Sequence, residues 1–164
     1  MTDLVIDVIA MEAEHHPRHL SIPSSLPKSP LNGIRWTCPG ATRWRVRAVY
    51  YQIFTSAVAA NRVPSLTVRD QNGATVARVA ASTTIPAATF SEITFAAGVG
   101  IAPFGSVSVI TVPIPELILS PGWSVEIDTI AADGGDGVGL ANLEVLSVTE
   151  RTAPTFDPSS TADQ

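Results

Sequence analysis

The chain of 164 residues contains a single cysteine, Cys38. An intrachain disulfide needs two cysteines, and a thiolate metal cluster needs several, so the sequence excludes both. The fold must therefore be stabilised by packing alone.

Charged residues are also scarce, at 15% of the chain, whereas hydrophobic residues make up 45%. The formal net charge is −5, which argues against nucleic acid as the main partner because phosphate binding needs a basic surface. A chain of this length forms one domain with one core. Its apolar surplus predicts that some apolar surface is buried between subunits, and hence a homo-oligomer, with a trimer as one candidate.

Long hydrophobic runs are missing too, since the longest apolar stretches are far shorter than a membrane span. The first seven residues are acidic and lack the basic start of a secretory signal. We expect a protein made in the cytoplasm of its host cell, with no membrane partner.

Residues 43–150 contain no convincing helix and no recognisable catalytic motif, but they contain many short β-rich runs. Strands are predicted at residues 44–54, 65–70, 75–80, 89–95, 106–112, 123–131 and 139–149. Asn72-Gly73 supplies positive φ between two of these runs and predicts a tight hairpin. The pattern predicts an all-β fold, an antiparallel β-sandwich that is jelly-roll-like. We expect its core to include Val46, Tyr50, Leu66, Val68, Phe90, Phe95, Val125, Ile127 and Leu146.

Three segments are expected along the chain: an extended arm over residues 1–42, the sandwich over residues 43–150, and a flexible polar tail over residues 151–164. Prolines at four positions between residues 23 and 39 forbid a continuous helix in the arm. Its apolar anchors are Leu20, Ile22, Leu26, Leu31 and Ile34. The arm either wraps its own sandwich or reaches a neighbouring subunit, and we expect contacts outside its own sandwich.

Arg43, Arg45 and Arg47 alternate with apolar residues and form a basic row on one strand face. Such a row suits either an ordinary exposed face or a carboxylate row on another subunit. Together with the five apolar anchors, these arginines are the candidate interface residues.

Histidine occurs only in the arm, as His15, His16 and His19 beside two glutamates. Pro17 breaks the helical register that would place the outer two on one face, and no cysteine assists, so a solvated linker is favoured over a metal site. No serine lies in a nucleophile-elbow pattern. We expect no catalytic residue, no cofactor and no required metal, and therefore no enzyme.

Two acidic pairs allow more specific hypotheses. Asp133 and Asp136 lie in a glycine-rich segment but lack the spacing of a calcium loop, which favours a plain hairpin connection. Glu126 and Asp128 fall on one strand face and are predicted to be a solvent face rather than a glycosidase pair.

Five aromatic residues are candidates for a sugar-stacking platform: Trp36, Trp44, Trp123, Tyr50 and Tyr51. Aromatic residues in strands are more often buried anchors. Both alternatives remain open from the sequence.

Four segments have a characteristic spacing: the stretch from Val49 to Leu66, especially from Phe54 on, the Asp70-to-Gly73 hairpin, the run from Phe90 to Gly98, and Leu117 to Gly122. In these segments the chain resembles small β-rich virion proteins of tailed bacteriophages. The resemblance covers roughly residues 44–150 and is one of spacing rather than of a catalytic signature. It implies a structural component of heads or necks, often a jelly-roll-like sandwich.

The resemblance and the composition together lead to one expected function. We expect a bacteriophage capsid decoration or cement protein, located in the virion, whose partners are the major capsid protein or other virion proteins. The alternatives are a head–tail neck or fibre-base protein and, from another class, a carbohydrate-binding β-sandwich.

Overall fold

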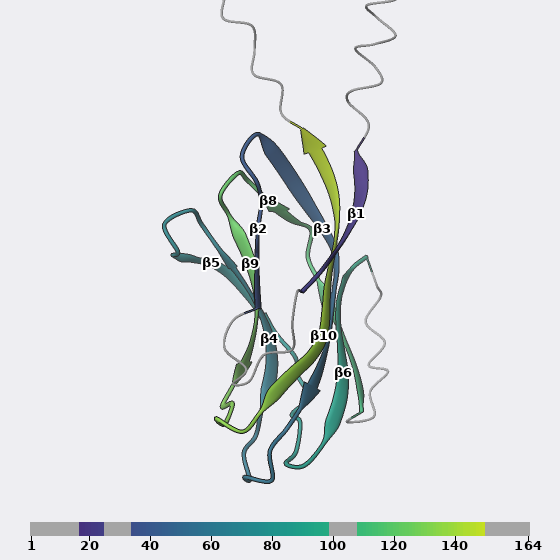
Figure 1. The fold of residues 1–164 in the computed structure, drawn as a ribbon, viewed down its shortest axis with the longest axis vertical. Helices are drawn as coiled ribbons and strands as arrows, with labels where there is room; N and C mark the ends of the chain where they lie inside the picture. The colour runs from purple at the N-terminus through teal and green to yellow at the C-terminus, as the bar shows by residue number, and fades with distance from the viewer. Residues whose placement is uncertain (1–16, 25–33, 99–107, 150–164) are drawn as a thin grey trace, which may run out of the picture.

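The computed structural model describes residues 17–24, 34–98 and 108–149, and within them every regular element is a β-strand. The strands form two sheets that face each other, as expected for an all-β sandwich (Figure 1). Their bounds are β1 Arg18–Pro23, β2 Ile34–Thr37, β3 Thr42–Phe54, β4 Val63–Arg69, β5 Thr75–Ala80, β6 Phe90–Ala97, β7 Val109–Ile114, β8 Leu117–Leu119, β9 Ser124–Ile130 and β10 Gly137–Thr149.

The strand order is that of a jelly roll. One sheet has the order β1-β10-β3-β6-β7, and the other has the order β2-β9-β4-β5. Four antiparallel pairs are nested along the chain, β4 with β5, β3 with β6, β2 with β9 and β1 with β10. A long hairpin rolled into two sheets has this nesting, which confirms the predicted antiparallel sandwich.

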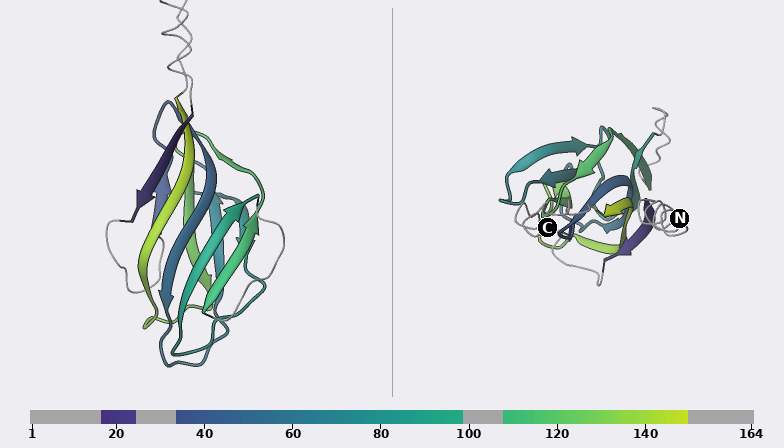
Figure 2. Two further views of the ribbon diagram at one scale, coloured as in Figure 1. Left: turned by 90° about the vertical axis from the view of Figure 1, so that its right-hand side faces the viewer. Right: turned by 90° about the horizontal axis from the view of Figure 1, so that it is seen from above.

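Two short strands, which lie between β6 and β9 in the sequence, extend the larger sheet. β7 pairs with β6 in parallel, and β8 pairs with the first part of β3. Figure 2 (left) shows β1, β10, β3, β6 and β7 side by side, with the first at one edge and the last at the other.

The innermost hairpin, β4 to β5, turns at the predicted Asn72-Gly73 pair. Gly73 has φ of 83°, a conformation that a residue without Cβ adopts at little cost. One carboxylate oxygen of Asp70 accepts hydrogen bonds from the backbone N–H groups of Asn72 and Ala74. The turn therefore has the local chemistry that the sequence indicated.

The expected arm differs from the structure over residues 18–23 and 34–37, which are strands of the sandwich itself. β1 pairs with β10, and β2 pairs with β9 and buries Ile34 and Trp36 in the core. Both strands lie at sheet edges, where Pro23 at the end of β1 is tolerated. Leu26, Leu31, residues 1–16 and the tail of residues 151–164 lie outside the described residues.

Six of the nine predicted core residues are buried between the sheets, namely Val46, Leu66, Val68, Phe95, Val125 and Ile127. The prediction is wrong for Tyr50, Phe90 and Leu146, which lie on the outer face of the larger sheet. Phe90 is 43% exposed, whereas Phe95 on the same strand is fully buried.

The wrong prediction for Tyr50 has a local cause in β3. Val46 pairs with Val145 and Ala48 pairs with Glu144, so Arg47 is an extra residue in the ladder, a β-bulge. The bulge shifts the inward phase by one residue, and Tyr51 rather than Tyr50 points into the core.

The outward positions of Phe90 and Leu146 follow from the two-residue period of their own strands. Ser91, Ile93 and Phe95 point inward on β6, which places Phe90 outside. On β10, the inward residue is Val145, so its neighbour Leu146 faces outward.

Candidate interaction surface

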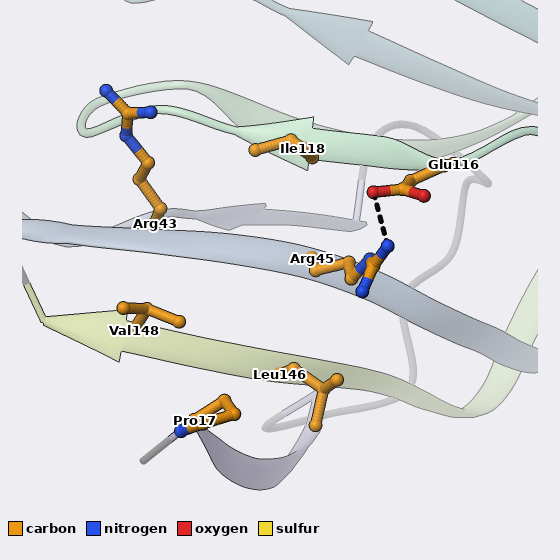
Figure 3. A pocket seen from close by; sticks show the side chains of 7 residues that line it. All are labelled: Pro17, Arg43, Arg45, Glu116, Ile118, Leu146 and Val148. Carbon is orange, nitrogen blue, oxygen red and sulfur yellow. Dashed lines mark ion pairs between the residues drawn. The ribbon is translucent and has the colours of Figure 1, made fainter. Parts of the chain in front are cut away.

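A groove lies on the outer face of the larger sheet, near the end where β1 begins and β10 ends (Figure 3). Register explains its composition, because Leu146 pairs with Arg45, Val148 pairs with Arg43, and Arg45 pairs with Ile118. Cross-strand partners point to the same face of a sheet. The groove has a volume of about 440 Å³ and is lined by Pro17, Arg43, Arg45, Glu116, Ile118, Leu146 and Val148.

The apolar residues of the groove are partly open to solvent. Ile118 is 52% exposed, and Val148 is also exposed. Figure 3 shows Leu146 and Val148 on β10 and Ile118 on β8, on either side of the arginines of β3. The groove therefore places two arginines of β3 between apolar side chains of β8 and β10 on an exposed sheet face.

One ion pair lies within the lining of the groove. Arg45 Nη2 lies 2.6 Å from Glu116 Oε1, and both side chains are about half exposed. The hydrogen bond from Arg45 lowers the pKa of Glu116 below its usual range, and the same bond raises the pKa of Arg45. Both groups are therefore charged at neutral pH, and the lining residues carry two guanidinium groups and one carboxylate.

The predicted basic row is exposed along its whole length. Arg43 and Arg45 line the groove, and Arg47 lies exposed at the bulge of β3. Their contact with another subunit stays a prediction.

The apolar anchors that the structure describes differ in their exposure to solvent. Leu20 on β1 is exposed at 37%, and Ile22 is half-buried against the core. Ile34 is buried inside its own sandwich. β2 needs an apolar residue at this position because its inner face meets the opposite sheet.

The outer face of the smaller sheet carries a network of ion pairs. Glu126 on β9 accepts from Arg35 of β2 at 2.9 Å and from Arg69 of β4 at 2.7 Å. Burial alone would raise the pKa of Glu126, but the hydrogen bonds from these arginines outweigh it and lower the pKa. Asp128 accepts from Arg78 of β5 at 3.0 Å. The two carboxylates thus belong to a face that is held together by ion pairs, as the prediction of a polar face requires.

A buried ion pair closes the opposite end of the sandwich. Arg62 Nε lies 2.6 Å from Asp136 Oδ2, and neither side chain is exposed. Backbone N–H groups of Ser56 and Asp133 also donate to Asp136, at 2.7 and 2.8 Å. Burial alone would raise the pKa of Asp136, but these hydrogen bonds, led by the one from Arg62, lower it below its usual value.

The Arg62–Asp136 ion pair gives the acidic segment a role that neither sequence hypothesis, a calcium loop or a plain hairpin connection, had described. Residues 133–136 form an ordered turn in which Asp136 N donates to Asp133 O, rather than a plain flexible connection. Both carboxylate oxygens of Asp136 already accept hydrogen bonds from protein groups, so this carboxylate is satisfied without a cation. The sequence had pointed to no partner for Asp136, because Arg62 is 74 residues away.

The five candidate aromatic residues are not brought together as a platform, and Trp123 is half-buried against the core. Trp36, Trp44 and Tyr51 are buried in the core, where a sugar has no access. Tyr50 lies on the outer face and donates to Glu92 at 3.0 Å. The aromatic rings exposed nearby are those of Phe54 and Phe90, whose centroids are 4.9 Å apart.

His19 is exposed on β1, while His15 and His16 lie outside the described residues. No cluster of three or more histidine, cysteine, aspartate or glutamate side chains suited to a metal occurs within residues 17–24, 34–98 and 108–149. The same residues include no helix that is long and apolar enough to cross a membrane. Cys38 is buried, and its thiol donates to the carbonyl oxygen of Thr42 at 3.3 Å.

Comparisons of the sequence with known proteins identify no relative. No protein-family model matches the chain, and no curated protein matches it.

The fold has weak similarity to chains of two solved virus structures. A chain of infectious bursal disease virus, Gx strain, aligns with a TM-score of 0.36 and 11% identity over 86% of this chain and 32% of that chain. A nora virus chain aligns with a TM-score of 0.33 and 13% identity over 89% of this chain and 64% of that chain. This chain thus spans less than two thirds of either neighbour. At such low scores the likeness implies nothing about activity.

Proposed function

We propose that this protein is a virion structural subunit of a tailed bacteriophage that binds the capsid surface as a decoration or cement protein and stabilises the head. The observation that carries the proposal is the nested strand pairing from β4–β5 out to β1–β10. That order is the jelly roll, a fold used by viral capsid domains and also by lectins and cupins. The resemblance of residues 44–150 to phage virion proteins selects the first of these classes.

The side chains of the described residues support a role in binding rather than in chemistry. The space between the sheets is packed with apolar residues such as Phe95, Leu119 and Ile127, rather than shaped around a ligand. The ionisable groups with the strongest contacts, Arg62 with Asp136 and Glu126 with two arginines, are held in ion pairs. We therefore propose that the protein acts by burying surface, without catalysis and without a cofactor.

The test is binding to particles. Purified full-length protein is mixed with heads of the encoding phage that lack it, sedimented, and located on the shell by electron cryomicroscopy. We expect many copies at repeated lattice positions and a higher temperature of head disruption. An unrelated β-sandwich with the same net charge of −5 is the control for non-specific adsorption.

The outcomes separate the alternatives. Density at a single vertex would replace the decoration role with a neck or fibre-base role. Absence from the particle, together with saturable binding of a glycan, would overturn the virion role. Turnover of an ester or glycoside that is lost in Asp133→Ala or Glu126→Gln would show that the protein is an enzyme.

A further inference from the structure

Two exposed phenylalanines lie next to each other on the outer face of the larger sheet. Phe54 ends β3 and Phe90 begins β6, and the two residues are cross-strand partners on neighbouring strands (Figure 2, left). Their side chains are 50% and 43% exposed, and their ring centroids are 4.9 Å apart. Every other aromatic residue that the structure describes is buried or half-buried. Packing of the core therefore does not account for these two rings.

The next row of the same face is polar. Gln52 and Glu92 are cross-strand partners two residues further into the strands. The Tyr50 hydroxyl donates to Glu92 Oε1 and accepts from Gln52 Nε2, each at 3.0 Å. These hydrogen bonds hold the three side chains in place, but they involve neither Glu92 Oε2 nor Gln52 Oε1. Two acceptor oxygens are thus left for a ligand beside the rings.

Gly139 on β10 leaves the space in which the ring of Phe54 and the amide of Gln52 lie. A Cβ atom at residue 139 would come within 2.9 Å of Phe54 Cε2 and within 3.0 Å of Gln52 Oε1. The register of β10 shifts between Val138 and Ala141, so the glycine lies in a β-bulge. The ring and the amide therefore lie close to the backbone of β10, on strands rather than on loops, which favours a preformed site.

These residues form one surface, which we call the aromatic surface: Tyr50, Gln52, Phe54, Phe90, Glu92 and Gly139. Its only charged side chain is that of Glu92, so it disfavours an anionic ligand. The faces of the phenylalanine rings attract partly positive C–H groups. The carboxylate accepts hydrogen bonds from hydroxyl groups, and the amide both donates and accepts them. A ligand that combines a C–H face with hydroxyl groups and no charge is a neutral sugar.

We propose that the aromatic surface binds a neutral oligosaccharide, with sugar rings against Phe54 and Phe90 and sugar hydroxyls hydrogen-bonded to Glu92 and Gln52. The two phenylalanine rings are tilted by 46° to each other, so they do not form one flat platform. This tilt suits a soluble chain of sugars better than the flat surface of a crystalline polysaccharide. The inference goes beyond the proposed function, because it requires no capsid.

The experiment titrates the full-length protein with four oligosaccharides and follows the backbone amide signals by NMR. The neutral probes are maltohexaose, cellohexaose and chitin hexasaccharide, and the anionic probe is hexagalacturonate. The titrations extend to about 10 mM, because a small exposed site binds weakly. We expect saturable shifts, centred on β3 and β6 near Phe54 and Phe90, with at least one neutral probe and none with hexagalacturonate.

Variants test whether the two rings carry the binding. Phe54→Ala and Phe90→Ala should each weaken it by at least about tenfold, whereas Phe90→Trp, which keeps an aromatic ring, should still bind. The matched control is Ile118→Ala, because Ile118 is 52% exposed on the same sheet face but belongs to the groove. This control should bind as the wild type does. Circular dichroism of each variant checks that the fold is unchanged.

Three results would overturn the proposal. They are no saturable binding of any neutral probe, equal binding by the Phe54→Ala, Phe90→Ala and Ile118→Ala variants, and tighter binding of hexagalacturonate than of the neutral probes. A protein that binds no sugar but loses particle binding in the two phenylalanine variants would show that the aromatic surface contacts protein instead. Particle binding by a protein that fails the sugar tests would leave the proposed function intact.

Discussion

Arg62 and Asp136 form an ion pair with both side chains completely buried and a separation of 2.6 Å between Nε and Oδ2. Arg62 ends the connection from β3 to β4, and Asp136 ends the connection from β9 to β10. Both connections pass from one sheet to the other. The pair therefore joins two corners of the sandwich and holds the sheets together at the end opposite the groove.

Replacing Arg62 with Met should destabilise the protein by about 3–5 kcal/mol, because it leaves the Asp136 carboxylate buried without its cation. Arg62 also donates to Ser56 Oγ at 2.9 Å and to Val58 O at 3.0 Å, and these acceptors lose their donor too. Urea unfolding monitored by circular dichroism gives the free energy. The control is Arg78→Met, whose pair with Asp128 is exposed and should contribute less than about 1 kcal/mol. Equal losses in the two variants would contradict the assignment.

The same pair predicts how stability changes in acid. The folded-state pKa of Asp136 is lowered, so the unfolded chain binds more protons as pH falls, and stability decreases in that direction. The contribution is fully present above the usual Asp pKa of 3.8 and is lost as pH falls through the lower, folded pKa. Asp136→Asn should be less stable at pH 7 and should show a shallower decrease of the unfolding free energy below about pH 4. Unfolding curves at several pH values test this, and parallel pH profiles for the two proteins would contradict it.

The strands of the sandwich were largely predictable because alternation and turn residues are local signals. The Asn72-Gly73 turn and the run that became β3 are where the sequence indicated. β1 and β2 escaped prediction because they are short and are separated by a proline-punctuated stretch, and their pairing with β10 and β9 is remote in sequence. The Arg47 bulge has no sequence signal that we recognised, so the inward phase beyond it was wrong.

The candidate site was predictable only in part, because only some of its residues are close together in the sequence. The alternation of Arg43 and Arg45 is visible within one strand, and the structure places both in the groove. Ile118 and Leu146 join them through the pairing of β8 and β10 with β3, which no local pattern encodes.

The register of β6 predicts opposite outcomes for two phenylalanines five residues apart. Phe95→Ala should cost about 3–5 kcal/mol, because it removes a fully buried ring and leaves a cavity. Phe90→Ala should cost much less, because Phe90 is on the outer face beside Phe54. Thermal and urea unfolding compare the two variants. A larger loss for Phe90→Ala would contradict the register and the correction to the predicted core.

The surroundings of Tyr51 predict that its replacement by Phe does not lower the stability of the fold. Its ring stacks on Phe95 with an interplanar angle of 9°, and its buried hydroxyl makes no well-formed hydrogen bond with a described residue, although the Thr129 hydroxyl lies near it. Burial raises the pKa of Tyr51 far above its usual value, so the hydroxyl is neutral. Tyr51→Phe keeps the ring and removes the unpaired group, so stability should be unchanged or rise by about 1 kcal/mol.

A matched variant on the other face gives the contrast. Tyr50→Phe removes a hydroxyl that donates to Glu92 and accepts from Gln52, each at 3.0 Å, and should lose about 0.5–1.5 kcal/mol. Unfolding free energies of both variants are measured under one condition. A loss of more than about 1 kcal/mol in Tyr51→Phe would show that a buried water or another group satisfies the hydroxyl.

Truncation separates the part of the arm that belongs to the fold from the part that does not. A chain that starts at Thr42 lacks β1 and β2 and should lose its cooperative unfolding transition. Without β2 the core loses Ile34 and Trp36, and without β1 the backbone of β10 loses a partner strand from Arg18 to Pro23. A chain that starts at Pro17 keeps every described strand and should melt within a few degrees of the full-length protein. Differential scanning calorimetry compares the three lengths. A cooperative, unshifted transition in the Thr42 chain would show that the two edge strands are dispensable, and a lost transition in the Pro17 chain would show that residues 1–16 belong to the core structure.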